Sequence, residues 1–188
     1  MYSTYWLDNV RWTYRLRQFF EALSATPTPA DLALVREILT PSQAALFAQL
    51  QPSEQAHAAR VLREVEARCC AQGIPTPAEL QTAALLHDVG KARYPLRLWE
   101  RVIIVLGQAI RPEAATRWGQ ETTSPPRGWR RPFVIAAQHP AWGADMAAER
   151  GAPPRVVALI RRHQDRVSLT ESEEDQWLTI LQAVDDEN

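Results

Sequence analysis

The sequence predicts an all-α protein, and two observations carry that prediction. No stretch of useful length alternates apolar and polar residues, which is the pattern of a half-buried strand. In addition, helix starts recur in one form: threonine, then proline, then an acidic or amide side chain two residues later. Threonine is a good N-cap, proline suits the first helical position, and the acid or amide can complete a capping box. We therefore expect helices throughout and no sheet.

The individual helices follow from these starts and from the apolar residues between them. The starts are Thr28-Pro29-Ala30-Asp31, Thr40-Pro41-Ser42-Gln43 and Thr76-Pro77-Ala78-Glu79, and Thr170 with Glu173 repeats the box without proline. We expect helices at about residues 6–24, 29–38, 42–50, 53–71, 77–87, 95–110, 133–137, 140–150, 153–164 and 171–186. Residues 111–132 are rich in proline, glycine and tryptophan, and we expect a long ordered loop or a broken helix that shapes a binding site.

The length of 188 residues indicates one domain with an extension. We expect residues 1–50 to form an N-terminal helical extension packed on a core domain of residues 51–188. The aromatic side chains of the extension are predicted to lie in the core or at an interface; they are Tyr5, Trp6, Trp12, Tyr14, Phe19 and Phe20.

Composition excludes several classes of partner. The net charge of −1 gives no nucleic-acid footprint, and the longest aliphatic run, Val102 to Leu106, is too short for a membrane span. The N-terminus lacks the basic and then apolar pattern of a secretory signal. Cys69 and Cys70, the only cysteines, are adjacent and do not suit an ordinary structural disulfide. These features favour a cytoplasmic protein.

The adjacent pair His87 and Asp88 is the strongest candidate for a functional site. A run of apolar and small residues leads into this pair, and Gly90 and Lys91 follow it. A carboxylate after such a run is costly to bury unless it is paired or binds a metal. Gly90 could end the helix, and Lys91, the only lysine among 21 basic residues, would then direct a compact cation at a bound phosphate. The alternative is a plain His-Asp turn at the end of a helix.

The other three histidines have similar helical positions. His57 shares a face with Val61 and Val65, and His163 shares one with Ile160, so both imidazoles are expected to point inward. His139 precedes Pro140 and is expected at a helix start. Taken singly, each could be an ordinary core or cap histidine.

An aspartate near the C-terminus completes the set. Asp185 shares a face with Leu178 and Leu181, and a carboxylate on an apolar face requires a cation. Asp186 is the alternative if the helical register differs by one residue. Imidazole and carboxylate ligands together suit a divalent metal such as Mn, Fe or Zn.

These residues, in this order, resemble the HD-domain superfamily of metal-dependent phosphohydrolases. The segment Ala83 to Lys91 is similar to the signature of that family, and the resemblance covers about residues 51 to 188. His139 and His163 resemble the further ligands of HD proteins that hold two metals. Gln164 stands where the cyclic-dinucleotide phosphodiesterases of that branch commonly have a histidine, and their Gly-Tyr-Pro signature is absent.

The resemblance implies an HD-domain helical bundle with a metal centre of two divalent transition metals. Fe or Mn is expected first, with Zn, Co, Ni and Mg as alternatives. The implied metal ligands are His57, His87, Asp88, His139, His163 and Asp185. Asp88 would bridge the metals, a metal-activated water would attack, and Lys91 would bind a phosphate oxygen.

The resemblance also implies a substrate class, a nucleotide or a related small phosphate ester. Arg93, Arg97, Arg130, Arg131 and Arg162 are candidate phosphate contacts. Trp99, Trp118, Trp129 and Trp142 could stack a base, although core packing is the commoner role of tryptophan. The alternative functions are a non-catalytic HD sensor or scaffold and a di-iron oxygenase. The oligomeric state stays open, with a homodimer as one option.

Overall fold

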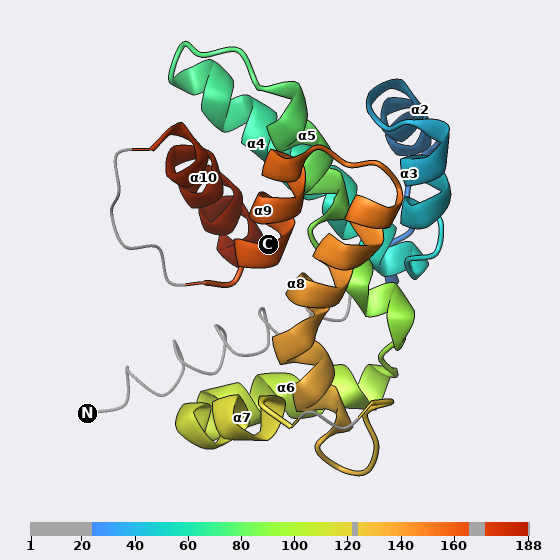
Figure 1. The fold of residues 1–188 in the computed structure, drawn as a ribbon, viewed down its shortest axis with the longest axis vertical. Coiled ribbons are helices and arrows are strands. Elements are labelled where there is room, and N and C mark those ends of the chain that lie inside the picture. The colour runs from blue at the N-terminus through green and yellow to red at the C-terminus, as the bar shows by residue number, and fades with distance from the viewer. Residues whose placement is uncertain (1–23, 122–123, 166–171, 188) are drawn as a thin grey trace, which may run out of the picture.

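In the part of the chain that the structure describes, the regular secondary structure consists of helices, with no strand. The computed structural model describes residues 24–121, 124–165 and 172–187 (Figure 1). The helices, in order, are α2 (Pro29–Ile38), α3 (Pro41–Phe47), α4 (Pro52–Ala71), α5 (Ala78–Leu86), the 3-10 helix η1 (Val89–Arg93), α6 (Leu98–Ile110), α7 (Pro112–Gly119), α8 (Arg131–Glu149), α9 (Pro154–Arg162) and α10 (Glu173–Glu187). The all-α prediction is confirmed. The helix predicted at residues 6–24 lies, up to residue 23, outside the described residues.

Two of the three Thr-Pro starts fold as predicted. Thr28 and Thr40 cap α2 and α3, and Asp31 and Gln43 close the two boxes. The third prediction was wrong, because α5 begins at Ala78 with Pro77 as its N-cap and without a side-chain cap. Proline has no side-chain acceptor, so this helix start depends on tertiary packing instead.

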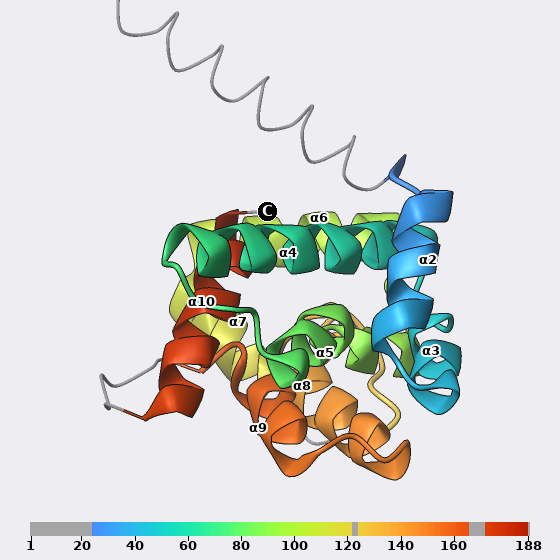
Figure 2. The same cartoon turned by 90° about the horizontal axis from the view of Figure 1, so that it is seen from above.

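The apolar core lies where α4, α5, α9 and α10 meet. Fully buried residues from each helix contribute, among them Leu62, Leu85, Leu159 and Leu181. Phe47 of α3 belongs to the same cluster. Figure 2 shows α4 spanning one side of the molecule, with α5 and α9 on its inner side. Packing of these side chains holds the helices in place, and with them the predicted metal ligands that the helices carry.

The helix α8 corrects the prediction of two helices at 133–137 and 140–150. It is a single helix from Arg131 to Glu149 with Pro140 inside it. The proline removes one backbone donor and thus one helical hydrogen bond, yet packing holds the helix together on both sides. It contacts η1, α7 and α9. His139 therefore lies in mid-helix rather than at a helix start.

The segment 111–132 contains an ordered helix, α7, so the broken-helix alternative holds for its first part. In Figure 1, α6 and α7 form one end of the molecule, and α8 leads from them to the remaining helices. Within the described ranges, no helix is long and apolar enough to cross a membrane.

Candidate metal centre

The six predicted metal ligands converge at the centre of the fold. His57, His139 and Asp185 lie within α4, α8 and α10, whereas His87 and His163 directly follow α5 and α9. Three of the histidines, His87, His139 and His163, are buried. Asp185 faces the cluster, while Asp186 is exposed, so the register favours Asp185.

Asp88 occupies the middle of this cluster. Its Oδ1 lies 3.1 Å from Nε2 of His139 and 3.9 Å from Nε2 of His163. Its Oδ2 lies 3.7 Å from Nε2 of His87 and 4.0 Å from Nε2 of His57. The two carboxylate oxygens thus face different pairs of imidazoles, which is the arrangement a ligand shared between two metal ions requires.

Two groups of potential ligands result, and Asp88 belongs to both. One is His57, His87 and Asp88; the other is Asp88, His139 and His163. In each group, the ligand atoms lie within 4.8 Å of one another. Asp185 extends the first group, because its Oδ1 lies 3.0 Å from Nε2 of His57 and 3.4 Å from Nε2 of His87.

Backbone carbonyls orient three of these imidazoles. Nδ1 of His87 donates to Ala84, Nδ1 of His139 to Ile135, and Nδ1 of His163 to Ile160, at 2.9, 3.1 and 2.7 Å. Because a carbonyl only accepts, each ring carries its proton on Nδ1 and presents Nε2 to the cluster.

The Nε2 atoms that these three imidazoles direct at the cluster have no hydrogen-bond partner among the described residues. All three atoms, those of His87, His139 and His163, are buried. Such a group costs about 1–3 kcal/mol when nothing compensates it. Three on one cluster, beside ionised carboxylates, fit divalent metal ions, which take neutral imidazole nitrogen and carboxylate oxygen as ligands.

The pKa values of His87 and His163 are shifted in opposite directions. Burial lowers the pKa of His87, but the carboxylates of Asp88 and Asp185 outweigh it and raise that pKa to about 9. Burial, together with the imidazoles of His87 and His139, lowers the pKa of His163 to about 3. The first group therefore demands a cation, and the second contains an imidazole that stays neutral.

The carboxylates remain ionised despite their burial. Burial raises the pKa of Asp88, yet Lys91 and His87 hold it well below its usual range. Burial likewise raises the pKa of Asp185, and the charge on His87 and the hydrogen bond from His57 hold it far below its usual range. Ionised carboxylates are the form in which aspartate binds metals.

Gly90 brings the His-Asp turn against α8. A Cβ on this residue would lie 2.0 Å from the carbonyl oxygen of His139 and 2.6 Å from the amide nitrogen of Gly143. The expectation that Gly90 ends a helix was wrong: α5 ends at Leu86, η1 contains Gly90, and its φ is not positive. The glycine is needed for close approach, which places Asp88 within reach of His139.

The predicted cations have different surroundings. Nζ of Lys91 lies 2.5 Å from Oδ2 of Asp88, so its charge does point at the cluster. Arg131 donates instead to Glu100 and to the carbonyl of Pro95. Arg131 therefore serves to attach α8 to α6 rather than facing the cluster.

Arg93, Arg130 and Arg162 also make contacts elsewhere. Arg93 lies over the rings of Tyr94 and Trp142. Arg130 lies over Trp129 and 3.6 Å from Glu121. Both carboxylate partners of Arg162, Glu174 and Asp175, belong to α10.

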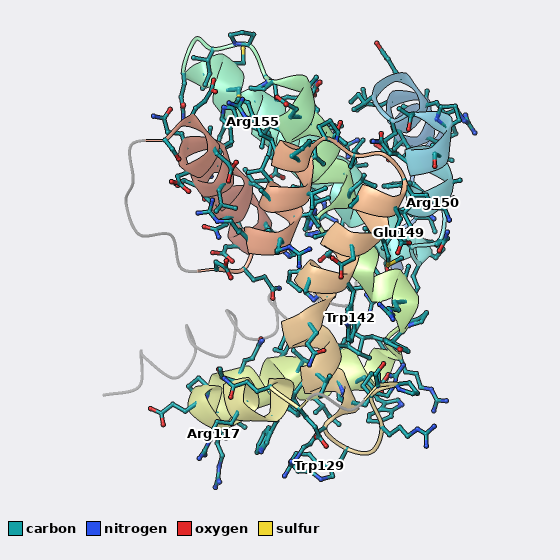
Figure 3. The ribbon with its side chains drawn as sticks, viewed as in Figure 1. Arg117, Trp129, Trp142, Glu149, Arg150 and Arg155 are labelled. Atoms are coloured by element: carbon teal, nitrogen blue, oxygen red, sulfur yellow. The ribbon has the colours of Figure 1, made fainter. Side chains whose placement is uncertain are left out.

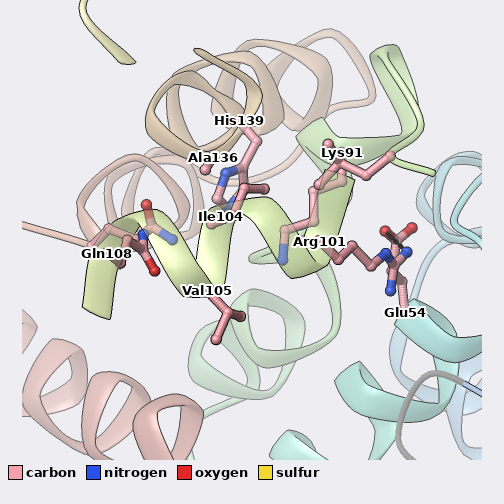
Figure 4. A pocket seen from close by; sticks show the side chains of 10 residues that line it. Glu54, Lys91, Arg101, Ile104, Val105, Gln108, Ala136 and His139 are labelled. Carbon is pink, nitrogen blue, oxygen red and sulfur yellow. Dashed lines mark hydrogen bonds and ion pairs between the residues drawn. The ribbon is translucent and has the colours of Figure 1, made fainter. Parts of the chain in front are cut away.

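A cavity of about 230 Å³ adjoins the cluster, and its wall includes a cation that sequence reasoning missed (Figure 4). The lining residues are Glu54, Lys91, Leu96, Arg101, Ile104, Val105, Gln108, Ala136, His139 and Gln164. Arg101 is held in the wall by Glu54, at 2.6 Å, and by Ser53, at 3.3 Å. No local pattern marks this arginine, because its role depends on how α6 lies against α4.

Three of the four candidate tryptophans contact other aromatic rings, whereas Trp99 is 50% exposed. Trp118 contacts Trp129 and Phe133, and Trp142 contacts Tyr94. In Figure 3, Trp129 lies at the outer edge of the α7 end and Trp142 lies along α8. As far as the described residues form it, the cavity wall contains no tryptophan.

The fold and the site together define an all-α protein with a buried cluster of histidine and aspartate side chains that could hold divalent metals. Comparison with known families identifies it further: the family model of the HD domain matches residues 55–186. The chain belongs to the HD domain family, a superfamily of mainly metal-dependent hydrolases, and the predicted resemblance is confirmed. No curated protein and no solved structure gives a significant match to the chain.

Proposed function

We propose that this protein is a phosphohydrolase that uses two divalent metals to hydrolyse a small phosphate ester. The observation that carries the proposal is the shared carboxylate of Asp88 among three buried, unsatisfied Nε2 atoms. A protein that used this fold only as a scaffold would gain nothing from three buried nitrogen atoms, each of which costs free energy when it has no partner. This argues for a functional metal centre over the alternative of a non-catalytic sensor.

The candidate ligands would bind two metals, and other residues of the site would bind the substrate. His57, His87 and Asp185 would hold one metal, and His139 and His163 the other, with Asp88 shared. Metals bound there would polarise the phosphate and lower the pKa of a coordinated water to near neutrality. The Nδ1 hydrogen bonds keep the imidazoles oriented, so that little reorganisation is needed when metal or substrate binds.

Lys91 would neutralise the phosphate. It lines the cavity, its side chain is 25% exposed, and its Nζ contacts Asp88. A phosphate that enters the cavity next to Asp88 would meet this ammonium, which is a compact charge suited to a single phosphate oxygen.

The cavity favours a phosphate monoester with a small, uncharged organic part. Among the described residues, its charged lining consists of two cations, Lys91 and Arg101, and one carboxylate, Glu54, which pairs with Arg101. The organic part would lie against Leu96, Ile104 and Val105. This wall offers little compensation for a polyphosphate chain, and about 230 Å³ is less than the cavities that hold drug-sized ligands.

The test combines elemental analysis with a substrate panel. We expect about two metals per chain and faster turnover of phenyl phosphate than of a dinucleoside polyphosphate or a cyclic dinucleotide. Two metals without hydrolysis of any ester would contradict the hydrolase, and oxygen consumption with a small polyol would then indicate the oxygenase. A protein that binds no metal after reconstitution would instead be a scaffold.

A further inference from the structure

The helix α6 exposes an apolar face to solvent. Its large apolar side chains are unusually exposed: Leu98 55%, Trp99 50%, Val105 49%, Leu106 52% and Ile110 71%. Glu100 is its only buried residue. At about 100° per residue, these five side chains and the partly exposed Val102 and Ile103 lie on one side of the helix. We call this side the outer face of α6.

The opposite side of α6 is what attaches it to the molecule. Glu100 pairs with Arg131 of α8, and Arg101 pairs with Glu54 of α4. A Cβ at Gly107 would lie 2.5 Å from the ring of Phe133, so the helix approaches α8 closely there. These contacts fix the orientation of α6. Its outer face therefore cannot turn inward without breaking two buried ion pairs.

An amphipathic surface helix normally buries its apolar face and exposes its polar one. Here the arrangement is reversed, because the polar residues face the body and the apolar ones face outward. A contiguous exposed apolar patch of this kind marks an interaction site.

The chain itself carries a matching apolar face in residues 2–23, which lie outside the described part. Tyr5, Trp12, Leu16, Phe19 and Leu23 follow one another at spacings of seven, four, three and four, which places them on one face of a helix. Arg11, Arg17, Gln18 and Glu21 fall on the other face, together with Leu7, Val10 and Tyr14.

This segment is tethered near α6. Asp31, at the start of α2, pairs with Arg63 on α4, and Arg101 of α6 pairs with Glu54 on the same helix. Positions 54 and 63 are separated by about 14 Å along α4. A helix over residues 2–23 would be about 33 Å long, and α6 is about 20 Å long. The segment can therefore reach the outer face from its point of attachment.

We propose that residues 2–23 form an amphipathic helix whose aromatic face packs on the outer face of α6. The tether makes this association intramolecular, which favours it over docking of a separate chain. Val105 lies on the outer face and also lines the cavity, so the segment would lie beside this cavity.

The test is a double-mutant cycle in the full chain. We expect Leu16→Glu and Leu106→Glu each to lower the thermal unfolding midpoint by about 3–6 °C, and the double variant to fall little further than the worse single variant. Leu16→Ala and Leu106→Ala form a milder cycle if the glutamates prevent folding. Ile74→Glu, at an exposed apolar residue after α4, and Gln18→Glu, on the other face of the segment, are the controls and should change the midpoint by less than about 1 °C.

Three results would overturn the proposal. An unchanged midpoint in Leu106→Glu would show that the outer face is uncovered. Additive effects of the two substitutions would show that residue 16 does not lie on residue 106. A dimer in sedimentation velocity that Leu106→Glu converts to a monomer would assign the face to a second copy of the chain.

Discussion

At the scale of single residues, Asp185 and Asp186 form a matched pair. Asp185 lies 3.0 Å from His57 and 3.4 Å from His87, whereas Asp186 is exposed. We expect Asp185→Asn to weaken one metal site at least tenfold and lower the metal content from about two to about one per chain. Asp186→Asn should retain both metals. Elemental analysis after dialysis measures the difference, and equal loss in the two variants would contradict the assigned register.

Arg101 carries a second prediction, on substrate binding. We expect Arg101→Gln to raise KM for phenyl phosphate about tenfold, a loss of about 1.4 kcal/mol, with unchanged metal content. Arg117→Gln is the control, because Arg117 lies at the outer end of α7 (Figure 3). Arg101→Gln also leaves the buried carboxylate of Glu54 without its cation, which lowers the stability of the fold. Arg101→Lys keeps a positive charge beside Glu54, so comparison of the two variants separates a loss of folding from a loss of substrate binding. An unchanged KM in a folded Arg101→Gln would remove Arg101 from the site.

At the scale of elements, the contact between η1 and α8 builds the site. We expect Gly90→Ala to displace η1, because its Cβ would overlap the His139 carbonyl, and to reduce both metal content and stability. Gly73→Ala is the control: nothing lies within 4 Å of its Cβ, but its φ is +71°, so it should cost about 1 kcal/mol and keep the metals. Calorimetry and elemental analysis of the two variants test this. A Gly90→Ala protein with two metals would show that the close approach is unnecessary.

The helices could be predicted from the sequence to the extent that their signals are local. Thr28 and Thr40 mark true starts because the cap, the proline and the box residue lie within four positions. Pro140 misled the prediction, since a proline usually ends a helix and only packing on η1, α7 and α9 keeps α8 continuous. The orientation of α6 could not be predicted at all, because its apolar face points outward.

At the scale of the whole molecule, the clustering of the candidate metal ligands could be predicted from the sequence and the cavity could not. His57, His87, Asp88 and Asp185 belong to a pattern whose order and spacing survive in the sequence. The cavity joins side chains of α4, α6 and α8 that no spacing in the sequence relates, and Arg101 is held in its wall by Glu54 and Ser53 of α4. None of the five predicted arginines lines it; they are Arg93, Arg97, Arg130, Arg131 and Arg162.

Metal removal tests how far the centre holds the molecule together. The ligands come from α4, α8 and α10 and from the ends of α5 and α9, so bound metals would join five helices. Ligands that bind only the folded state stabilise it by about 4 kcal/mol at a concentration a thousand times Kd. For a chain of this size, that corresponds to about 8–16 °C in the unfolding midpoint. We therefore expect a chelator to lower the midpoint of the metal-loaded protein by this amount, and added Mn²⁺ or Fe²⁺ to restore it.

The control for metal removal is Asp88→Asn, which takes away the carboxylate that both groups share. This variant should bind little metal, so a chelator should leave its midpoint unchanged. It should also unfold below the chelated parent, because the amide cannot compensate Lys91 as the ionised carboxylate does at 2.5 Å. If the chelator lowers the midpoint of parent and variant equally, the stabilising metals bind elsewhere. If it lowers neither, the three unsatisfied imidazoles are not metal ligands, and their burial must be offset by other contacts in the core.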